Sequence, residues 1–390
     1  MTASTLPKIL FVDHTAVLGG AQLSLLDIAT AMRHRSAVVL FEDGDFAAAL
    51  VRRNLAVLPL SGDFALRTVK KTSRLPSIRA LLASASVARE LARIADGYSL
   101  LYSNSPKSFL ISAAAGFISR KPVIWHLRDI LDRAHFSSFN LRLMVSVANA
   151  RAARVVANSR ATADAFIQAG GNPDLVTVVY NGIDAASFVA SAAELDLESV
   201  RVEFGIPARA FLVGSFSRLH PWKGPQVLLD ALELIPDVHA LIVGGALFSG
   251  EREFEAQLRA RAQTPSLKGR VHITGMRFDV PRLMKGCDVV AHTSVLPEPF
   301  GRVLVEALLL CRPLIASNAG GVTEVVADQR TALLTPPGDA RALADAILVL
   351  RENPAFAQSL AIAGREDVKR RFSRDAMLTG VQAVIDSIVS

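Results

Sequence analysis

Two glutamates eight positions apart, Glu298 and Glu306, are the residues of this chain best suited to chemistry. They bracket a Pro-Phe-Gly turn and the first turns of an apolar helix that opens at Gly301, and an apolar strand at 287–292 precedes them. The first N–H groups of a helix have no intrahelical partner and carry the positive end of its dipole. We therefore expect one carboxylate, several free N–H groups and a second carboxylate to face one crevice at a strand's end.

Such a crevice suits a ligand with hydroxyls at both ends and an anionic centre, which describes a nucleotide-diphosphate sugar. The alternative is a solvated glutamate pair on a surface helix, but Glu306 stands among Val, Leu and Ala, which favours the ligand site. Arg218 and Lys223 follow an expected strand at 211–215. A planar guanidinium fork and a mobile ammonium group are suited to neutralising a leaving diphosphate. Without the glutamates, they would be interpreted as solvated loop cations.

Glycine pairs between expected strands and helices mark further candidate anion sites. Gly19-Gly20 follows the first strand, and 244–245 and 320–321 repeat the arrangement in the second half of the chain. Glycine lets a backbone approach a ligand closely, and helix N-termini bind anions. We expect these turns to form an anion-binding rim, although Gly19-Gly20 lacks the surrounding dinucleotide fingerprint.

Two other motifs each have a functional and a structural interpretation. His126 ends an expected strand, where it could hydrogen-bond a sugar hydroxyl or the reacting oxygens, or be an ordinary structural histidine. Asp43-Gly-Asp45 could hold a divalent cation. It lies directly between a strand and a helix, however, where Asp and Gly are common turn formers, and we favour the turn. No His, Cys and carboxylate cluster has metal-ligand spacing, so no metal site is expected.

Strand and helix patterns alternate along the whole chain, which predicts doubly wound, mostly parallel α/β sheets. Residues 185–194 read as a linker between the halves. The expected fold is therefore two Rossmann-like domains facing a cleft. The expected strands are 8–14, 37–41, 57–60, 100–103, 123–126, 155–158 and 176–179 before the linker, and 211–215, 240–243, 271–274, 289–292, 313–316 and 332–334 after it.

Length and composition agree with this fold. A chain of 390 residues is too long for one ordinary core, and its 51% hydrophobic content is typical of a well-packed protein. Cys287 and Cys311 both lie in apolar runs, so we interpret them as buried thiols of a reducing compartment. No signal peptide or transmembrane run is apparent, which predicts a cytoplasmic protein.

Positive charge is concentrated in the first half of the chain. Residues 1–187 hold 21 Lys and Arg against 13 Asp and Glu, whereas the remainder is nearly balanced. Segment 52–93 has the sharpest excess, with apolar residues between its cations. We expect it to contact an anionic membrane surface from the inner face; a solvated basic helix face is the alternative. Nucleic acid is not expected, because aromatic residues are few and no binding motif is present.

One set of residues closely resembles the nucleotide-sugar half of glycosyltransferase family 4. It consists of Arg218, Lys223, Glu298, Glu306, Gly320-Gly321 and Glu324. Gly19-Gly20, His126, 157–159 and 181–184 are similar to the family's marks in its first half, so the resemblance covers essentially the whole chain. It implies the GT-B fold, with an acceptor-binding domain at 1–187, a nucleotide-sugar domain at 195–372 and a C-terminal helix, 373–390, that crosses back onto the first domain. Thr323, where the family usually has Pro, and Arg302 are small departures.

The resemblance also implies roles for individual residues. Arg218 and Lys223 would hold the diphosphate, Glu298 the hydroxyls of the donor sugar, and Glu306 the ribose. His126 would lie near the transferred sugar. The remaining donor-binding candidates are Gly19, Gly20, Gly275, Phe300, Gly301, Arg302 and Val303.

The activity implied is retaining, metal-independent transfer of a sugar from a UDP- or GDP-sugar to an acceptor hydroxyl, without a cofactor. We expect a lipid-linked or surface-polysaccharide glycan as acceptor. The alternatives are another GT-B activity, such as a small-sugar synthase or a sugar-nucleotide epimerase, and a non-catalytic nucleotide-sugar-binding subunit. The intact set of two cations and two glutamates argues against the last of these.

Overall fold

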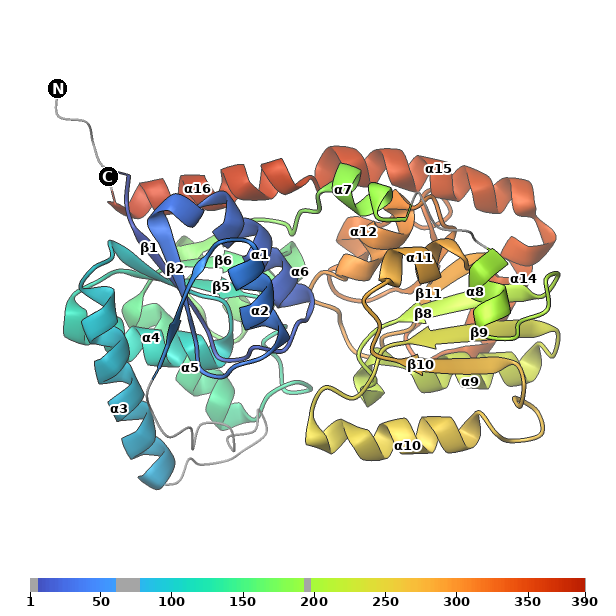
Figure 1. The fold of residues 1–390 in the computed structure, drawn as a ribbon, viewed down its shortest axis with the longest axis horizontal. Coiled ribbons are helices and arrows are strands. Elements are labelled where there is room, and N and C mark those ends of the chain that lie inside the picture. The colour runs from blue at the N-terminus through green and yellow to red at the C-terminus, as the bar shows by residue number, and fades with distance from the viewer. Residues whose placement is uncertain (1–5, 61–77, 193–197, 390) are drawn as a thin grey trace. The chain divides into compact units, whose positions relative to one another are not determined.

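The computed structural model describes residues 6–60, 78–192 and 198–389. Internal contacts divide the chain into two compact units, Met1–Gly182 with Asp375–Ser390, and Ile183–Arg374. Each unit contains one sheet, and every strand pairing within the described sheets is parallel. The predicted class of two parallel α/β sheets is confirmed (Figure 1).

The first unit is built on a seven-stranded sheet in the order β3-β2-β1-β4-β5-β6-β7. The central strands are apolar and buried on both faces, as expected for a parallel sheet covered by helices. Because all the strands are parallel, their carboxyl ends lie at one edge, where the loops carry polar residues. The strands are β1 (Ile9–Asp13), β2 (Ser36–Leu40), β3 (Ala56–Pro59), β4 (Leu100–Ser103), β5 (Val123–Leu127), β6 (Ala152–Ala157) and β7 (Val176–Val178).

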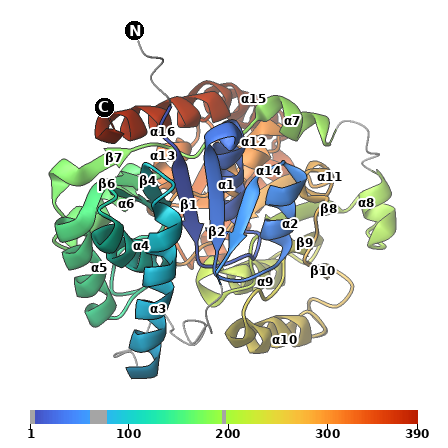
Figure 2. The same cartoon turned by 60° about the vertical axis from the view of Figure 1, so that its left-hand side comes forward.

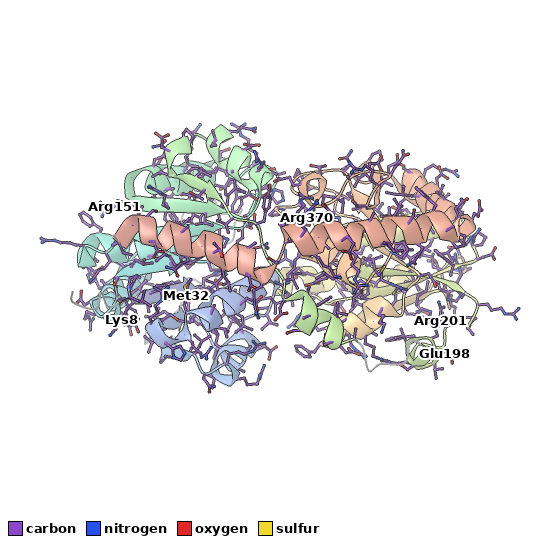
Figure 3. The ribbon with its side chains drawn as sticks, turned by 90° about the horizontal axis from the view of Figure 1, so that it is seen from above. Lys8, Met32, Arg151, Glu198, Arg201 and Arg370 are labelled. Carbon is purple, nitrogen blue, oxygen red and sulfur yellow. The ribbon has the colours of Figure 1, made fainter. Side chains whose placement is uncertain are left out.

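Alternate residues of β1 enter two separate apolar clusters, one on each face of this sheet. Leu10 and Val12 belong to the cluster with α3, α4 and α5, whereas Ile9 and Phe11 belong to the cluster with α1, α2 and α16 (Figure 2). Met32, labelled in Figure 3, is a member of the second cluster. The helices are α1 (Gly20–Ala31), α2 (Asp45–Arg52), α3 (Ile78–Ala95), α4 (Pro106–Ser119), α5 (Ser138–Arg151), α6 (Arg160–Gln168) and α16 (Arg374–Val389).

The second unit contains a six-stranded sheet in the order β10-β9-β8-β11-β12-β13. Its apolar cluster joins the sheet to α9, α10, α14 and α15. The strands are β8 (Phe211–Phe216), β9 (Val238–Val243), β10 (Val271–Gly275), β11 (Val289–His292), β12 (Leu314–Ser317) and β13 (Leu333–Thr335). The helices are α7 (Ala185–Ala190), α8 (Glu198–Glu203), α9 (Pro225–Leu234), α10 (Arg252–Arg261), α11 (Val280–Lys285), α12 (Arg302–Leu309), α13 (Val322–Val325), α14 (Ala340–Glu352) and α15 (Pro354–Arg371).

Side-chain caps define where α6 and α7 begin. The Oγ of Ser159 accepts a hydrogen bond from the Thr162 N–H at the start of α6. The predicted linker segment, 185–194, contains a helix, since α7 begins at Ala185. Asp184 caps this helix by accepting a hydrogen bond from the Ser187 N–H. It also forms a 2.7 Å ion pair with Arg374, so the segment is anchored at its first turn.

Candidate active site

Glu298 is the centre of a buried polar cluster in the second unit. β11 delivers it to the carboxyl edge of the sheet, and its side chain is only 9% exposed. One of its oxygens, Oε2, accepts hydrogen bonds from Lys223 Nζ at 2.6 Å, His292 Nε2 at 3.1 Å and Ser294 Oγ at 3.0 Å. Burial alone would raise the pKa of Glu298. The charge of Lys223, followed by the interactions with His292, more than offsets burial and holds the pKa well below its usual range.

Two glycines give the backbone around Glu298 its shape. Gly301, the N-cap of α12, has φ +82°, and Gly320 has φ +64°. Gly320 pairs with Glu298 in an isolated bridge, and the Gly321 N–H donates to the Glu298 carbonyl at 2.7 Å. A Cβ on Gly320 would lie 2.4 Å from that carbonyl oxygen. Gly320 therefore supports the neighbouring loop, a role that the strand–glycine–helix pattern alone did not suggest.

Glu306 lies further along α12, where it pairs with Arg302. Arg302 Nε is 2.8 Å from Glu306 Oε1, and both side chains are largely shielded from solvent. This is an i, i+4 pair on one helix face. Of the other predicted donor residues in this segment, Phe300 is buried with its ring edge-on to Phe372, and Val303 is half-buried. Arg302 thus pairs with Glu306, the residue that the resemblance assigns to the ribose.

Arg218 is held by a carboxylate that the sequence analysis missed. Its Nε lies 3.2 Å from Glu251 Oε1, and its guanidinium lies 5.5 Å from the ring centroid of Phe248. Glu251 is buried, and its other oxygen accepts hydrogen bonds from the Leu247 and Phe248 N–H groups. One carboxylate therefore orders both the loop after β9 and the predicted diphosphate-binding arginine. No motif marks Glu251 in the sequence, because the contact spans 33 positions.

The loop after β9 also corrects the predicted anion-binding rim. No helix begins at Gly245; α10 starts at Arg252. The Ala246 N–H donates to Glu255, while the next two N–H groups donate to Glu251. These amides are satisfied by the protein's own carboxylates, so they do not form a free anion site. Gly275, predicted to line the donor site, ends β10 and accepts a hydrogen bond from the Gly244 N–H.

Lys223 ends a short 3₁₀ turn, Pro221–Lys223, that directly precedes α9. His220 caps this turn by accepting a hydrogen bond from the Trp222 N–H, and Lys223 Nζ lies 4.1 Å from the centroid of the Trp222 ring. The structure thus brings Lys223 to Glu298 through a direct ion pair. Arg218 and Glu306 engage Glu251 and Arg302 in separate ion pairs.

In the first unit, a buried polar cluster surrounds His126, near the end of β5. His126 is fully buried, and its Nδ1 lies 2.6 Å from the Tyr102 hydroxyl and 3.2 Å from Arg128 Nη2. Its Nε2 is buried without a hydrogen-bond partner among the described residues. Burial, and secondarily the charge of Arg128, keep the pKa of His126 well below its usual value. His126 is therefore a neutral group with one polar atom unused.

A chain of hydrogen bonds through Arg128 and Asn104 connects His126 to the first strand. Arg128 Nε donates to Asn104 Oδ1 at 2.7 Å, and Asn104 Nδ2 donates to Asp13 Oδ2 at 2.7 Å. Arg128 also donates to Asn181 Oδ1 at 2.6 Å. Asp13 is fully buried and accepts a further bond from Gln22 on α1. None of Tyr102, Asn104 and Arg128 was singled out by sequence, since only the parallel pairing of β1, β4 and β5 brings their ends together.

The turn around Gly19-Gly20 is fastened to the loop that follows β2. Gly19 is the N-cap of α1 and its backbone is extended, with φ −131°, so its conformation does not require glycine. Within this turn, Thr15 Oγ1 donates to Glu42 Oε1 at 2.6 Å, and the Ala16 N–H donates to the same oxygen. Glu42 thus fixes the start of the turn that leads to the two glycines.

The interpretation of Asp43-Gly-Asp45 as a turn agrees with the structure. Asp43 Oδ1 accepts a hydrogen bond from the Gly44 N–H, and Asp45 is the first residue of α2. Among the described residues, no group of three His, Cys, Asp or Glu side chains has the geometry to hold a metal ion. The two carboxylates have the places expected of turn and helix-start residues.

The basic segment 52–93 has exposed arginines at both of its ends. Its residues 61–77 lie outside the described part of the chain, and Arg52, Arg53, Arg89 and Arg93 are exposed. Within the described ranges, no helix has the length and hydropathy needed to cross a membrane.

Comparison with known families matches both halves of the chain. Residues 18–187 match the family described as glycosyltransferase family 4, and residues 197–367 match glycosyl transferases group 1. Over 98% of its length, the chain also resembles all of the Anabaena HepE protein in a crystal structure with UDP-glucose, with 38% identity and a TM-score of 0.88.

Two curated relatives are similar over shorter stretches. The D-inositol 3-phosphate glycosyltransferase of Mycobacteroides abscessus is 33% identical over 211 residues, 53% of this chain and 46% of that protein. The phosphatidyl-myo-inositol mannosyltransferase of Mycobacterium leprae is 34% identical over 176 residues, 44% of each protein. The chain thus spans less than half the length of these two relatives.

Proposed function

Because the chain belongs to glycosyltransferase family 4 and has the GT-B fold, we propose that it is a retaining hexosyltransferase. It transfers a sugar from a nucleotide-diphosphate donor to an acceptor hydroxyl. The observation that carries the proposal is the Lys223–Glu298 ion pair, which lies at the carboxyl edge of the second sheet. This edge is where open α/β sheets bind their ligands.

The donor would displace contacts that the second unit makes within itself. Lys223 donates to a phosphate oxygen in place of Glu298, and Glu298 then accepts hydrogen bonds from hydroxyls of the sugar. Arg218, oriented by Glu251, donates to the diphosphate, and Glu306 accepts from the ribose. Since Glu298 stays ionised far below neutral pH, it is an acceptor throughout the physiological range.

The reaction breaks the bond between the anomeric carbon and the diphosphate oxygen. The electron pair leaves with the diphosphate, whose growing charge Arg218 and Lys223 stabilise. The acceptor hydroxyl attacks the same face of the oxocarbenium-like sugar, and its proton passes to an oxygen of the leaving diphosphate. No protein carboxylate acts as nucleophile, and retention follows from attack on the face that the diphosphate leaves. We expect transfer to survive chelation of divalent cations by EDTA.

UDP-glucose is the donor that we propose to test first, because the HepE structure, 38% identical over nearly the whole chain, holds it. A thermal-shift panel of UDP-, GDP-, dTDP- and ADP-sugars, without metal, would compare wild type with Arg218→Ala. A shift selective for the UDP-sugar, lost in the variant, is expected. A selective GDP-sugar shift would replace UDP as the donor base. A protein that responds to none of these sugars would contradict the donor site.

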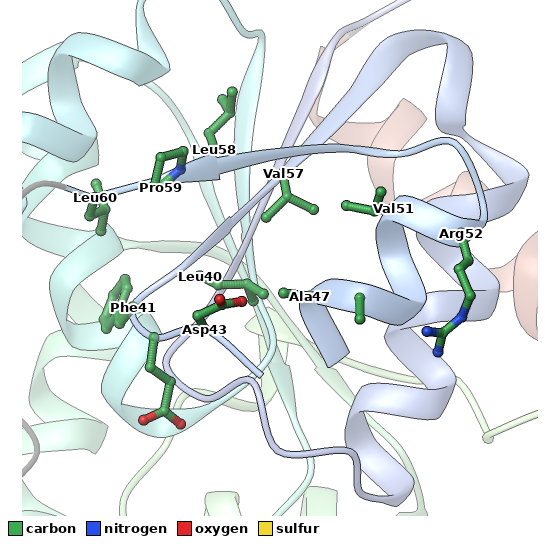
Figure 4. Close-up of a pocket in the computed structure, with 12 residues that line it drawn as sticks. Leu40, Phe41, Asp43, Ala47, Val51, Arg52, Val57, Leu58, Pro59 and Leu60 are labelled. Atoms are coloured by element: carbon green, nitrogen blue, oxygen red, sulfur yellow. The ribbon is translucent and has the colours of Figure 1, made fainter. Parts of the chain in front are cut away.

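For the acceptor we propose a lipid-linked glycan. The first unit has a hollow of about 740 Å³ at the carboxyl ends of β2 and β3. It is lined largely by apolar side chains of β2, α2 and β3, and Glu42, Asp43 and Arg52 are its charged lining residues (Figure 4). Exposed Arg52 and Arg53 stand at the end of α2. An apolar hollow beside cations fits a lipid next to a phosphate group.

Vesicle binding tests this acceptor class. We expect sedimentation with vesicles containing anionic lipid at low salt, and none with neutral vesicles. Arg52→Gln with Arg53→Gln should weaken sedimentation, while an Arg341→Gln variant in the second unit should not. Equal binding to both kinds of vesicle, or to neither, would contradict a charged lipid surface.

A further inference from the structure

Nε2 of His126 has no hydrogen-bond partner among the residues that the structure describes. The ring is fully buried, and Nδ1 has both of the contacts that the described residues supply. A buried polar atom without a partner costs free energy unless a ligand completes it. If the ring proton is on Nε2, a ligand acceptor atom can pair with Nε2; if it is on Nδ1, only a ligand donor can.

Arg128 determines that position. A guanidinium group has only N–H donors and stays charged, so its Nη2, at 3.2 Å, can only donate to Nδ1. Nδ1 must then present its lone pair, and the Tyr102 hydroxyl at 2.6 Å donates to it as well. In the neutral ring the single proton is left on Nε2. Protonating Nδ1 would place its N–H against the N–H of Arg128 and leave a second charge buried.

We propose that Arg128 and Tyr102 are positioning residues that lock His126 in the neutral Nε2–H tautomer, so that it donates a hydrogen bond to an oxygen of the bound substrate. It is then neither a general base nor an imidazolium. The assignment of this oxygen to the donor sugar rests on the proposed function. The tautomer rests only on the contacts of His126 with Arg128 and Tyr102.

The surrounding network makes this lock rigid. Arg128 is held by Asn104 and Asn181, while Asn104 is held in turn by Asp13. Among the described residues, the charged members of this hydrogen-bonded network are Arg128, after β5, and Asp13, at the end of β1. The Asn104 amide hydrogen-bonds both Asp13 and Arg128. The negative charge of Asp13 therefore partly balances the positive charge of Arg128 without a direct ion pair. Tyr102 from β4 is neutral at physiological pH, because burial raises its pKa further.

The chemistry of the proposed reaction explains the advantage of a neutral donor. An oxocarbenium-like sugar carries positive charge, which an imidazolium beside it would repel. A neutral N–H group orients a hydroxyl without that repulsion. Activity should accordingly show no acid limb from His126 across the range in which ordinary histidines titrate, around pH 6.5.

Nitrogen-15 NMR of the histidine rings tests the tautomer directly. His126→Gln identifies the His126 signals among those of the eight histidines. We expect the Nε2–H pattern, unchanged from about pH 5 to pH 8. A proton on Nδ1, or titration with a midpoint near 6.5, would overturn the proposal. This experiment needs no substrate, so its outcome does not depend on which reaction the protein catalyses.

Variants separate positioning from mere structural support. Arg128→Met should raise the pKa of His126, although burial still lowers it, and sugar-nucleotide turnover should then fall more at pH 5.5 than at pH 7.5. Arg128→Lys keeps a charged donor and should restore the flat profile. Tyr102→Phe should give a smaller acid limb, and Tyr98→Phe, outside the network, none. Equal losses at both pH values in Arg128→Met and Tyr102→Phe would show a structural role only.

A comparison of UDP-glucose with UDP tests whether the oxygen that pairs with His126 belongs to the sugar. We expect UDP-glucose, but not UDP, to move the His126 Nε2 resonance, since only the former has a sugar oxygen to accept the bond. The same shift with both would overturn the sugar as the partner of His126 and leave the tautomer standing. UDP-glucose binding by thermal shift, with no change at His126, would likewise exclude the sugar contact.

Discussion

The two units hold their polar sites by different physical means. In the second unit, three side-chain ion pairs carry the site: Lys223–Glu298, Arg218–Glu251 and Arg302–Glu306. In the first, charges are separated by an amide: Asp13 and Arg128 both bond to Asn104, and the group left over is the neutral His126. Ion pairs can be exchanged for a charged ligand, whereas a satisfied amide network is costly to rearrange. The second unit is suited to binding charge, and the first to orienting one neutral donor.

The largest expected effect comes from removing the cation of the central ion pair. Lys223→Met deletes the partner of the leaving diphosphate and leaves Glu298 buried with one donor fewer. Loss of one such electrostatic contact typically lowers kcat by about 10²–10³-fold. Steady-state assays of sugar-nucleotide turnover measure this. Lys268→Met, at an exposed position of the same unit, is the control. If both variants kept wild-type kcat, the second unit would not bind charge through Lys223.

A second variant tests whether backbone support matters as much as charge. Gly320→Ala would put a Cβ 2.4 Å from the Glu298 carbonyl oxygen at a residue with φ +64°. We expect a lower melting temperature and at least tenfold weaker donor binding, because the loop that carries Glu298 must move. Gly338→Ala has a similar φ of +79° but no close contact, so it isolates the cost of the dihedral angle. Equal effects of the two variants would show that displacement of Glu298 is not the cause.

A smaller effect should follow when the arginine loses its orienting partner. Glu251→Gln keeps an oxygen for the backbone N–H groups but removes the charge opposite Arg218. We expect KM for the donor to rise about tenfold with little change in melting temperature, since a charge-assisted hydrogen bond contributes about 1.5–3 kcal/mol. Glu253→Gln, exposed two positions on, is the matched variant. An unchanged KM in Glu251→Gln would mean that Arg218 needs no partner.

The smallest effect concerns pH and lies outside both sites. His239 and His272, on adjacent strands β9 and β10, stack with ring centroids 5.9 Å apart. Burial lowers the pKa of both, with the charge of Arg270 second for His239 and His239 itself second for His272. A group whose pKa falls on folding stabilises the fold above its unfolded pKa of about 6.5 and loses that stabilisation as pH falls.

The melting temperature of wild type should therefore decline as pH falls below about 6.5. In the double variant His239→Gln with His272→Gln, the decline should be shallower. The pKa of Glu298 lies too low for it to contribute in this range. Identical slopes in the two proteins would assign the acid sensitivity to other groups.

The sequence by itself determined the fold class and the main charged residues of the second unit. Runs of apolar residues with glycine and capping signals set the order of strands and helices, since these are local properties. The spacing of Glu298 and Glu306, with Arg218 and Lys223 upstream, was enough to predict a nucleotide-sugar site. The same local rules missed α7, because an alanine-rich stretch capped by Asp184 resembles a linker in its small residues.

Only the tertiary structure decided which groups partner these residues. Glu251 reaches Arg218 across 33 positions, and Gly320 supports Glu298 from the next strand–helix turn. Tyr102 and Arg128 meet at His126 because β4 and β5 are adjacent and parallel. No periodicity encodes such contacts, since they depend on which strands pair and where each one ends. The low pKa of His126 follows from its burial and from the charge of Arg128. The Asn104 amide lies between the charged groups Asp13 and Arg128 because three strand ends meet there.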